Sequence, residues 1–458
     1  NKLEELIMKN EILIQKEKLR VSKFLYFHPK YSLILDILNW KIYHLNDDEY
    51  RALKIGIFNN IGEESIKELL YFNIIENKEI DYDSFIIYLI NKTIYNNNLR
   101  LTIIPTESCN FRCVYCYENH NSGYMNKQTV DILLKYLRKN YAKFDSINVE
   151  WFGGEPLLMK DYVIQISQEI KALQDKYKKP YVASMTTNGY LLDIDTFNKL
   201  LDNNVYYYQI TLDGPAKCHD ALRPHVSGKG TYDVIMKNLI EISKLPDYKY
   251  FKIAIRININ KSNYNFIDDF SYKLNELFGN DKRFSILYET VKDWGGESVK
   301  NIKSDLFNDR NEVNSKLNYN NINVYNEFFE SIENRMCHSS KLYGFVYNYD
   351  GTVCKCAKAL YEDDYIKEIN EIGYINKFGK LVFNEMYHSR WLKVNFNRKE
   401  CHSCIWMPAC ITMRCPLGDL KNVGNRCFIE DFGVDSIDNC LYNSYLNNKY
   451  IHIGDKNG

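Results

Sequence analysis

The sequence predicts an α/β fold with a parallel β-sheet at its centre and a smaller region on each side. In the middle of the 458-residue chain, six strand-like runs alternate with amphipathic stretches. Alternation of this kind predicts parallel strands joined by crossover helices. Short strands followed by helices precede the sheet, and nine closely spaced cysteines follow it. A chain of this length can form several such domains, each with its own core.

The composition excludes several classes of protein. The 59 basic and 59 acidic residues cancel, so no strong overall charge favours nucleic acid or an anionic membrane. No apolar run reaches the roughly eighteen residues that a membrane-spanning helix needs, and no segment resembles a secretion signal. Thirteen cysteines in such a chain indicate metal ligands rather than disulfides. We therefore expect a globular protein of the reducing cytoplasm.

The first 97 residues are expected to form a small domain of strands and helices. Residues 1–20 predict a charged helix, and alternating runs predict three strands; Asn46 then begins a helix that runs through Ile55. A second helix and a final wing complete a pattern that resembles the winged-helix peptide-recognition element of peptide-modifying enzymes; a small structural cap on the central domain is the alternative. The third strand, 41–45, is the best candidate for an exposed edge that a peptide could extend. The predicted strands, second helix and wing cover residues 23–28, 31–37, 41–45, 65–71 and 72–78.

The central region supplies the strands of the parallel sheet. Amphipathic stretches at 129–141 and 162–176 are the clearest crossover helices. The predicted strands cover residues 101–104, 146–151, 181–187, 206–212, 252–259 and 283–288.

Three cysteines follow the first of these strands. Cys109, Cys113 and Cys116 are separated by three and then two residues. Three thiolates in so short a loop can hold three irons of a 4Fe–4S cube and leave the fourth iron open. A zinc knuckle is the alternative, although structural zinc sites usually use four ligands with a different pairing. The Cys-x-x-x-Cys-x-aromatic-Cys pattern resembles the signature of radical S-adenosylmethionine (SAM) enzymes.

This resemblance implies a partial (β/α)6 barrel of the TIM type. It also implies that Cys109, Cys113 and Cys116 are the catalytic metal ligands, and that SAM chelates the open iron. Reduction of the cluster then cleaves SAM to a 5′-deoxyadenosyl radical. In this family the aromatic residue before the last cysteine, here Tyr115, lies near the adenine.

Other motifs of the family fall at the ends of the predicted strands, where barrel enzymes carry their sites. Gly153, Gly154 and Glu155 end the second strand, and this Gly-Gly-Glu-Pro motif binds the methionine amine in the family. The two glycines allow close backbone approach. Thr187 belongs to a Thr-Asn-Gly turn, and Thr211 replaces the more common serine of a Ser-x-Asp-Gly-Pro segment. A ligand role and a structural role both stay open for Arg223, Arg256 and Asn258.

The cysteines beyond residue 336 resemble those of the SPASM domain, which carries auxiliary 4Fe–4S clusters. An Asp350-Gly351 turn predicts a hairpin over residues 347–353. Four residues separate Cys410 from Cys415, where the family usually has three. The resemblance implies one cluster on Cys401, Cys404, Cys410 and either Cys427, which we prefer, or Cys440. It implies a second cluster on Cys337, Cys356 and Cys415, whose fourth ligand is Cys354 or whose fourth position is open. Zinc is the alternative at either site.

Together these patterns resemble a radical SAM enzyme with a SPASM domain that matures a peptide, of the ranthipeptide, sactipeptide or streptide type. The expected reaction is a crosslink, first of all a cysteine thioether, in a ribosomally made precursor with a leader. Carbon–carbon crosslinking, formylglycine formation and a non-catalytic iron–sulfur scaffold are the alternatives. The expected partners are the precursor and an electron donor such as flavodoxin or ferredoxin. The predicted domains are 1–97 (recognition), 98–295 (barrel), 296–335 (bridge) and 336–458 (SPASM).

Overall fold

The computed structural model describes residues 15–293, 298–307, 336–392 and 401–453, the last with gaps at 402, 414, 422–426, 428, 430–432 and 447. The chain divides into two compact units that do not follow chain order. The first unit contains Asn1–Tyr95, Glu327–Lys341 and Lys393–Gly458, and the second contains Asn96–Asn326 and Leu342–Leu392.

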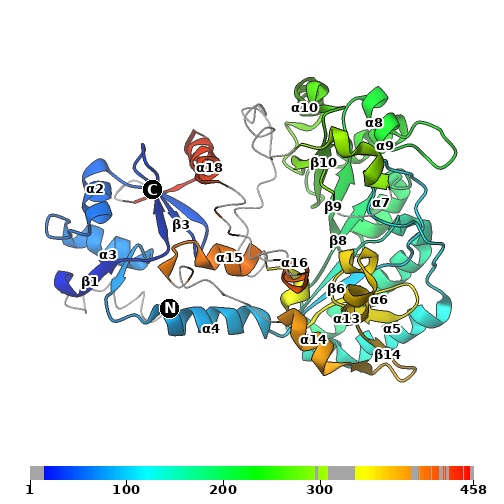
Figure 1. Ribbon diagram of the computed structural model, residues 1–458, viewed down its shortest axis with the longest axis horizontal. Helices are drawn as coiled ribbons and strands as arrows, with labels where there is room; N and C mark the ends of the chain where they lie inside the picture. Colours follow the sequence, from blue (N-terminus) through cyan, green and yellow to red (C-terminus); the bar gives the residue numbers. More distant parts are fainter. Residues whose placement is uncertain are drawn as a thin grey trace. The chain divides into compact units, whose positions relative to one another are not determined.

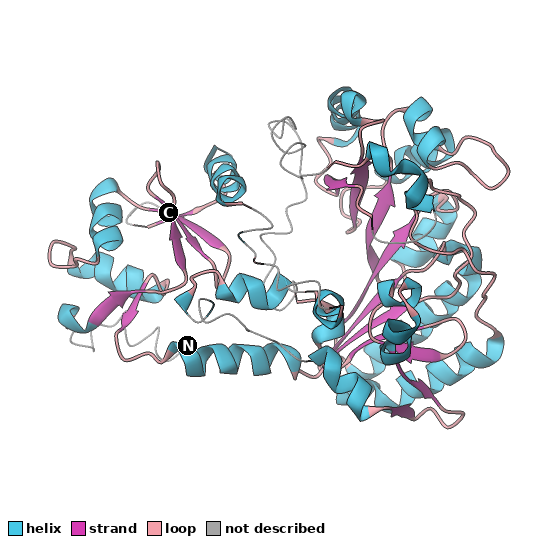
Figure 2. Cartoon of the chain, viewed as in Figure 1, coloured by secondary structure: helices cyan, strands magenta, loops and turns pink. Residues whose placement is uncertain are grey.

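A ten-stranded sheet forms the centre of the second unit (Figures 1 and 2). Its strands β6 to β11 are neighbours in chain order, and each is parallel to the next. The predicted alternation is therefore confirmed, and the large parallel sheet is consistent with a partial TIM barrel. The bounds are β6 (Asn98–Ile103), β7 (Ser146–Trp151), β8 (Tyr181–Thr187), β9 (Val205–Thr211), β10 (Lys252–Ile259) and β11 (Phe284–Thr290).

The crossover helices bury one apolar face each. In α5, Leu133 and Leu137 are buried one turn apart, and the side chain of Asn126 caps the helix by accepting from the Thr129 amide. Both helices predicted from the sequence are confirmed. The bounds are α5 (Lys127–Asn140), α6 (Lys160–Tyr177), α7 (Ile194–Leu201), α8 (Ala216–Leu222), α9 (Tyr232–Ser243) and α10 (Ile267–Phe278).

The predicted hairpin is also confirmed, but it extends the central sheet. Strand β12 (Gly344–Tyr347) pairs in parallel with β6, and β13 (Thr352–Cys354) returns antiparallel to β12. Gly351 has φ of 92° in the turn, a backbone conformation that suits glycine. Strands β14 (Glu371–Ile375) and β15 (Leu381–Phe383) continue the sheet, and helices α13 (Asp364–Asn370) and α14 (Glu385–Leu392) complete this part.

The first unit is built on a four-stranded sheet in the order β16-β4-β3-β2. Helices α2 and α3 pack on it through a core that includes Ile34, Tyr43, Leu53 and Ile66. A two-stranded ribbon pairs β1 with β5. The bounds are β1 (Leu19–Val21), β2 (Leu25–Phe27), β3 (Leu33–Asp36), β4 (Lys41–His44), α2 (Asp47–Ile55), α3 (Glu63–Tyr71), β5 (Ile75–Asn77), α4 (Tyr82–Ile94), α15 (Met407–Met413), α16 (Pro416–Leu420), α18 (Val434–Leu446) and β16 (Ile451–His452).

One prediction about this sheet is wrong. Strand β4 was expected to be the open edge, but β16 pairs with it in parallel, with Ile451 opposite Tyr43 and His452 opposite His44. No local pattern predicted this pairing, because the two partners are about four hundred residues apart and β16 is only two residues long. Ile453 fixes the contact by burying its side chain in the core of the unit.

Several other predictions fall where the structure gives no test. Residues 1–14 of the predicted first helix and residues 308–335 of the predicted bridge lie outside the described residues. The four-domain division and the winged-helix and SPASM assignments stay predictions. Among the described residues, no helix is long and apolar enough to cross a membrane.

Candidate active site

The three cysteines of the motif lie in a loop between β6 and α5. Backbone hydrogen bonds join this loop to the chain that follows α8: the Arg112 amide donates to Pro224 O at 2.9 Å, and the Val114 amide donates to Leu222 O at 3.0 Å. The Val226 amide returns a bond to Asn110 O at 2.9 Å. The loop is therefore fixed by the segment that follows β9, more than one hundred residues away in sequence.

The Gly-Gly-Glu motif holds the other side of the loop through the amides of Gly154 and Glu155. The Gly154 amide donates to Thr106 O at 3.1 Å, and the Glu155 amide donates to Ser108 O at 2.9 Å. A Cβ atom at Gly154 would lie 2.5 Å from Glu107 O, so no larger residue fits. The close approach predicted for these glycines was to a ligand and stays a prediction, whereas the structure shows them close to the backbone of the cysteine loop.

The carboxylate of Glu155 is fully buried and accepts three hydrogen bonds. Its Oε1 accepts from Thr187 Oγ1 at 2.7 Å and from the Leu157 amide at 3.0 Å, and its Oε2 accepts from the Asn188 amide at 2.8 Å. Burial raises the pKa of Glu155, while these donors oppose the rise by stabilising the charge. The motif residues at the ends of β7 and β8 are thus in direct contact, while the SAM-binding roles that the resemblance implied for Glu155 and Thr187 stay predictions.

A second polar group forms around Tyr115, the residue before the last cysteine of the motif. Its hydroxyl donates to the carboxylate of Asp213, and it accepts from Arg223 Nη1 at 2.7 Å and from Asn258 Nδ2 at 3.1 Å. The Asn258 amide also donates to Asp213 Oδ1 at 2.8 Å. For Arg223 and Asn258, whose roles the sequence left open, the structure shows contact with a motif residue. Thr211 is buried at the end of β9, next to this group in sequence.

Burial dominates the electrostatics of these groups. It raises the pKa of Asp213, and the positive charge of Arg223 opposes the rise. It also raises the pKa of the Cys109 thiol to about 12. Because metal ligation requires the thiolate, a bound cation must compensate the cost of deprotonating Cys109.

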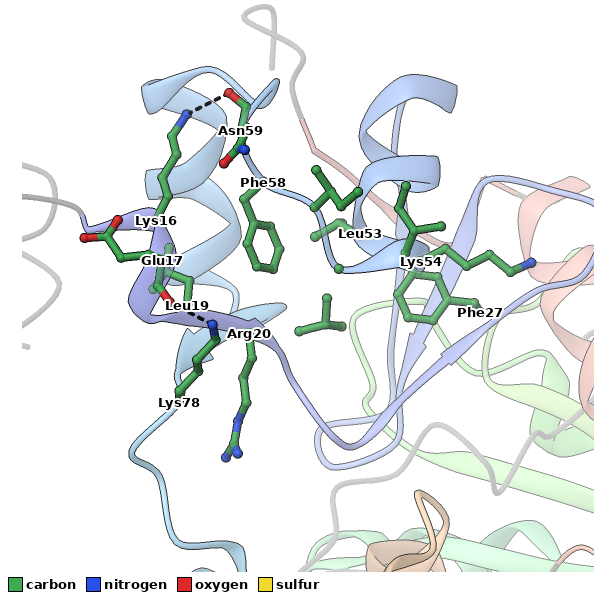
Figure 3. Close-up of a pocket in the computed structure, with 14 residues that line it drawn as sticks. Lys16, Glu17, Leu19, Arg20, Phe27, Leu53, Lys54, Phe58, Asn59 and Lys78 are labelled. Atoms are coloured by element: carbon green, nitrogen blue, oxygen red, sulfur yellow. Dashed lines mark hydrogen bonds between the residues drawn. The ribbon is translucent and has the colours of Figure 1, made fainter.

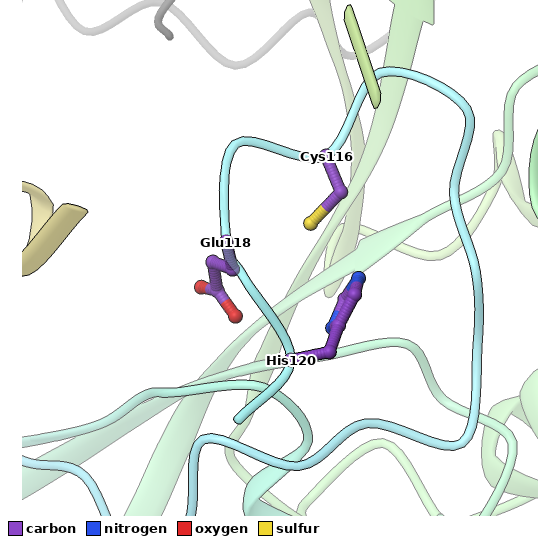
Figure 4. A group of neighbouring side chains, drawn as sticks. All are labelled: Cys116, Glu118 and His120. Atoms are coloured by element: carbon purple, nitrogen blue, oxygen red, sulfur yellow. The ribbon is translucent and has the colours of Figure 1, made fainter. Parts of the chain in front are cut away.

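A third group involves Cys116 itself. The ligand atoms of Cys116, Glu118 and His120 all lie within 4.8 Å of one another (Figure 4). Burial, followed by the charges of Glu107 and Glu155, raises the pKa of Glu118 to about 8. Sequence reasoning missed Glu118 and His120, although both follow directly after the motif. Among the described residues this is the sole group of three close enough to share one ion.

The donor set fits a 4Fe–4S cluster better than a single ion. Each cysteine of a cube binds a different iron, so the three sulfurs need not come as close as the ligands of one ion do. All three motif cysteines are half-buried, and the Phe111 amide donates to Cys109 Sγ at 3.4 Å. The buried Nε of Arg223 has no hydrogen-bond partner and leaves a donor beside the loop. The residues present therefore fit a cluster with a polar ligand beside it.

The predicted auxiliary ligands are divided between the two units. Cys354 and Cys356 belong to the second unit, and Cys337 and the later cysteines belong to the first. Cys354 is buried with Ile104 and Val346 in an apolar cluster, which is an ordinary setting for a cysteine without a metal. Its role as a ligand stays a prediction. Cys415 is exposed, and the half-buried members are Cys337, Cys356, Cys401, Cys404, Cys410, Cys427 and Cys440.

This chain is similar to a protein family and to individual enzymes in sequence. The model of the Radical SAM superfamily matches residues 103–253. A cysteine-type anaerobic sulfatase-maturating enzyme of Clostridium novyi is 25% identical over 346 residues, covering 68% of this chain and 87% of that enzyme. The Fe-coproporphyrin III synthase of Methanosarcina barkeri is 28% identical over 158 residues, which cover 34% of this chain and only 36% of that enzyme.

A solved structure shares the fold. Native anSMEcpe with bound AdoMet and Kp18Cys peptide superposes with a TM-score of 0.51 at 18% identity, covering 76% of this chain and 99% of that chain. The superfamily match spans β6 to β9, where the cysteine loop, the glycine pair and Glu155 lie together. The chain is therefore an enzyme with a radical SAM domain over residues 103–253, and it is similar in sequence to an enzyme that matures sulfatases.

Proposed function

We propose that this enzyme installs a crosslink, specifically a cysteine thioether, in a ribosomally made precursor peptide. The observation that carries the proposal is the length of the match to the sulfatase-maturating enzyme. Its 346 aligned residues exceed the 103–253 segment of the superfamily, so the likeness extends beyond the radical SAM domain. The anSMEcpe structure, which shares the fold, holds a peptide together with AdoMet. Both findings support a peptide substrate.

The site residues have distinct proposed roles. Cys109, Cys113 and Cys116 would hold the 4Fe–4S cluster, and Glu155 and Thr187 would bind SAM. When bound, cluster and SAM together supply a radical able to abstract hydrogen. Gly153 and Gly154 pack closely against the backbone of the cysteine loop, and Tyr115 is oriented by its hydrogen bonds to Asp213 and Arg223. Remaining proposed contacts to SAM are Tyr115, Gly153, Gly154 and Thr211.

Thioether formation removes two hydrogens from the peptide. The donor carbon loses a hydrogen atom, the cysteine thiol loses a proton, and the new carbon–sulfur bond releases one electron. The C-terminal cysteines would hold two auxiliary clusters that accept this electron, and a flavodoxin or ferredoxin would supply the electron that starts the next turnover. Iron analysis after anaerobic reconstitution should give about twelve irons per chain. One cluster's worth of iron with tightly bound zinc would contradict the auxiliary assignment.

Formylglycine formation is the second candidate, favoured by the same sulfatase-maturating relative. The two reactions differ in the mass of the product, because a thioether keeps the sulfur whereas formylglycine replaces it by oxygen. Mass spectrometry of peptides from the short reading frames beside the gene distinguishes them. Loss of two hydrogens with all sulfur retained and no free thiol left on the cysteine supports the thioether, and loss of sulfur, or loss of two hydrogens with every thiol still free, overturns it.

The Cys113→Ala variant tests whether the chain is an enzyme of this type at all. Removing one of three cluster ligands should stop production of 5′-deoxyadenosine from SAM, while the C-terminal cysteines should keep their iron. The Cys218→Ala variant is the control, because Cys218 lies outside both predicted cysteine sets and is half-buried on α8. Normal cleavage of SAM by Cys113→Ala would refute the assignment of the motif.

A further inference from the structure

A precursor peptide needs a docking surface, and the strand expected to provide it is already paired. The Ile453 amide donates to His44 O at 3.0 Å, and β16 covers the second half of β4. Ile453 is also 1% exposed in the core of the first unit, so β16 is part of the folded unit. A leader that added a strand to β4 would have to displace it.

A groove elsewhere in the same unit offers an alternative surface. It has a volume of about 540 Å³ and lies between β1, β2 and the end of α2 (Figure 3). Its apolar lining includes Leu19 and Val21 from β1, Phe27 from β2, and Leu53 and Phe58 from α2 and the turn that follows. This volume is within the range of sites that bind a few side chains.

The rim of the groove carries a net positive charge, because its lysines outnumber its single carboxylate, that of Glu17. Figure 3 shows Lys16 and Lys78 on one side and Lys54 on the other. Lys16 Nζ donates to Ile61 O at 2.6 Å and Lys78 Nζ donates to Glu17 O at 2.7 Å, both backbone carbonyls. No carboxylate forms an ion pair with these three lysines in the part of the chain that the structure describes, so their charge is available to an acidic ligand.

Two large apolar side chains are exposed at the same rim. Ile55 is 69% exposed and Ile57 is 49% exposed, on the two sides of Gly56. Gly56 ends α2 with φ of 72°, and a Cβ atom there would meet nothing within 4 Å. The turn therefore holds both isoleucines in solvent beside the lysines, where an apolar side chain of a ligand could contact them.

We infer that this groove binds an acidic segment of the precursor's leader, with a bulky apolar side chain in the groove and carboxylates on the lysines. The inference rests on the proposed function, because it takes the substrate to be a peptide. It places the docking surface on β1, β2 and the turn after α2, while β4 remains paired with β16.

Binding of labelled peptides to the full-length chain tests the inference. The probes are fluorescein-labelled synthetic peptides that tile the short reading frames beside the gene, and fluorescence anisotropy measures the Kd. The K54E/K78E variant should raise the Kd of an acidic peptide at least tenfold, and added salt should weaken binding to the native chain. The matched K30E/K41E variant changes the same charge on exposed lysines outside the groove and should alter the Kd less than twofold.

A second pair of variants tests the apolar contact without changing charge. I57S should weaken binding at least fivefold, whereas I87S, at a residue of α4 that is 59% exposed, should leave it unchanged. A peptide that is modified by the enzyme but binds K54E/K78E and I57S normally would overturn the groove and leave the proposed function intact. Peptides that are neither bound nor changed in mass would overturn the proposed function, and the groove with it. A dimer that I57S dissociates would assign the groove to a second copy of the chain and overturn the inference.

Discussion

The cysteine loop of the second unit and the sheet of the first unit are stabilised in different ways. Backbone hydrogen bonds to Thr106, Ser108 and Asn110 hold the loop against segments that follow β7 and β9, and the contacts leave no room for a Cβ atom at Gly154. The sheet is held by apolar side chains such as Ile34, Leu53 and Ile453. A loop fixed by backbone contacts tolerates little change of position, whereas an apolar core tolerates substitutions that conserve volume.

This difference suits the proposed roles of the two regions. A metal site requires its ligands in place before the metal binds productively, and hydrogen bonds provide the direction that apolar contacts lack. A peptide-binding unit needs a stable core and an accessible surface. The largest effects on chemistry should therefore come from the loop, and the largest effects on stability of the first unit should come from its core.

The strongest test of the contrast is Gly154→Ala. The added Cβ would collide with backbone oxygens of the cysteine loop. Backbone atoms cannot move aside as the end of a flexible side chain can. We expect the motif cluster to be lost and SAM cleavage to fall at least a hundredfold, measured by iron content and 5′-deoxyadenosine. Gly62→Ala is the control, because a Cβ atom there meets nothing within 4 Å. Normal iron loading in Gly154→Ala would contradict the tight fit.

The next largest effect should follow from Ile453→Ala in the first unit. Truncating a fully buried isoleucine typically costs about 2–5 kcal/mol. Denaturant unfolding should show this loss, while cleavage of SAM without peptide should stay normal. Deleting residues 1–95 would be a poorer test, because it removes the sheet on which β16 pairs and the Tyr26 hydroxyl that donates to Asp438 at 2.8 Å. A fall of SAM cleavage in Ile453→Ala would show that the two regions are not independent.

Tyr115→Phe should have a smaller effect on stability and a selective effect on chemistry. The change leaves Asp213 and Arg223 buried with one partner fewer, at a cost of about 1–3 kcal/mol. We expect weaker SAM binding with iron content unchanged, because the cysteines are not altered. Tyr136→Phe, on α5 and also buried, serves as control. Equal SAM affinity in both variants would assign Tyr115 a purely structural role.

The smallest predicted effect is a pH dependence of the β4–β16 pairing. Burial, followed by the nearby His452, lowers the pKa of His44 in the folded chain. Below about pH 6.5 the unfolded chain therefore binds more protons than the folded chain does. The pairing should be weaker in acid and fully formed above that pH. The protection factor of the Ile453 amide, which donates to His44 O, should therefore fall below pH 6.5 once the exchange rate is corrected for its intrinsic pH dependence. His44→Phe should flatten this profile, and an unchanged profile would exclude His44 as its cause.

Local patterns in the sequence were sufficient for much of the fold. Strand and helix periodicity predicted β6 to β11, α5 and α6 because each is a local property of consecutive residues. The Asp-Gly pair predicted the turn between β12 and β13 for the same reason. The cysteine spacing, Glu155 and Thr187 were found as site candidates because short motifs carry the chemistry of the site.

Only the tertiary structure decided which distant segments meet. It showed that β16 closes the edge of β4, that β12 extends the sheet beside β6, and that Arg223 and Asn258 bond to Tyr115. The physical reason is that such contacts depend on how the whole chain folds back on itself. A two-residue strand is too short to show a periodic pattern. Likewise, nothing in the residues around Arg223 indicates that its hydrogen-bond partner is Tyr115, 108 residues earlier in the chain.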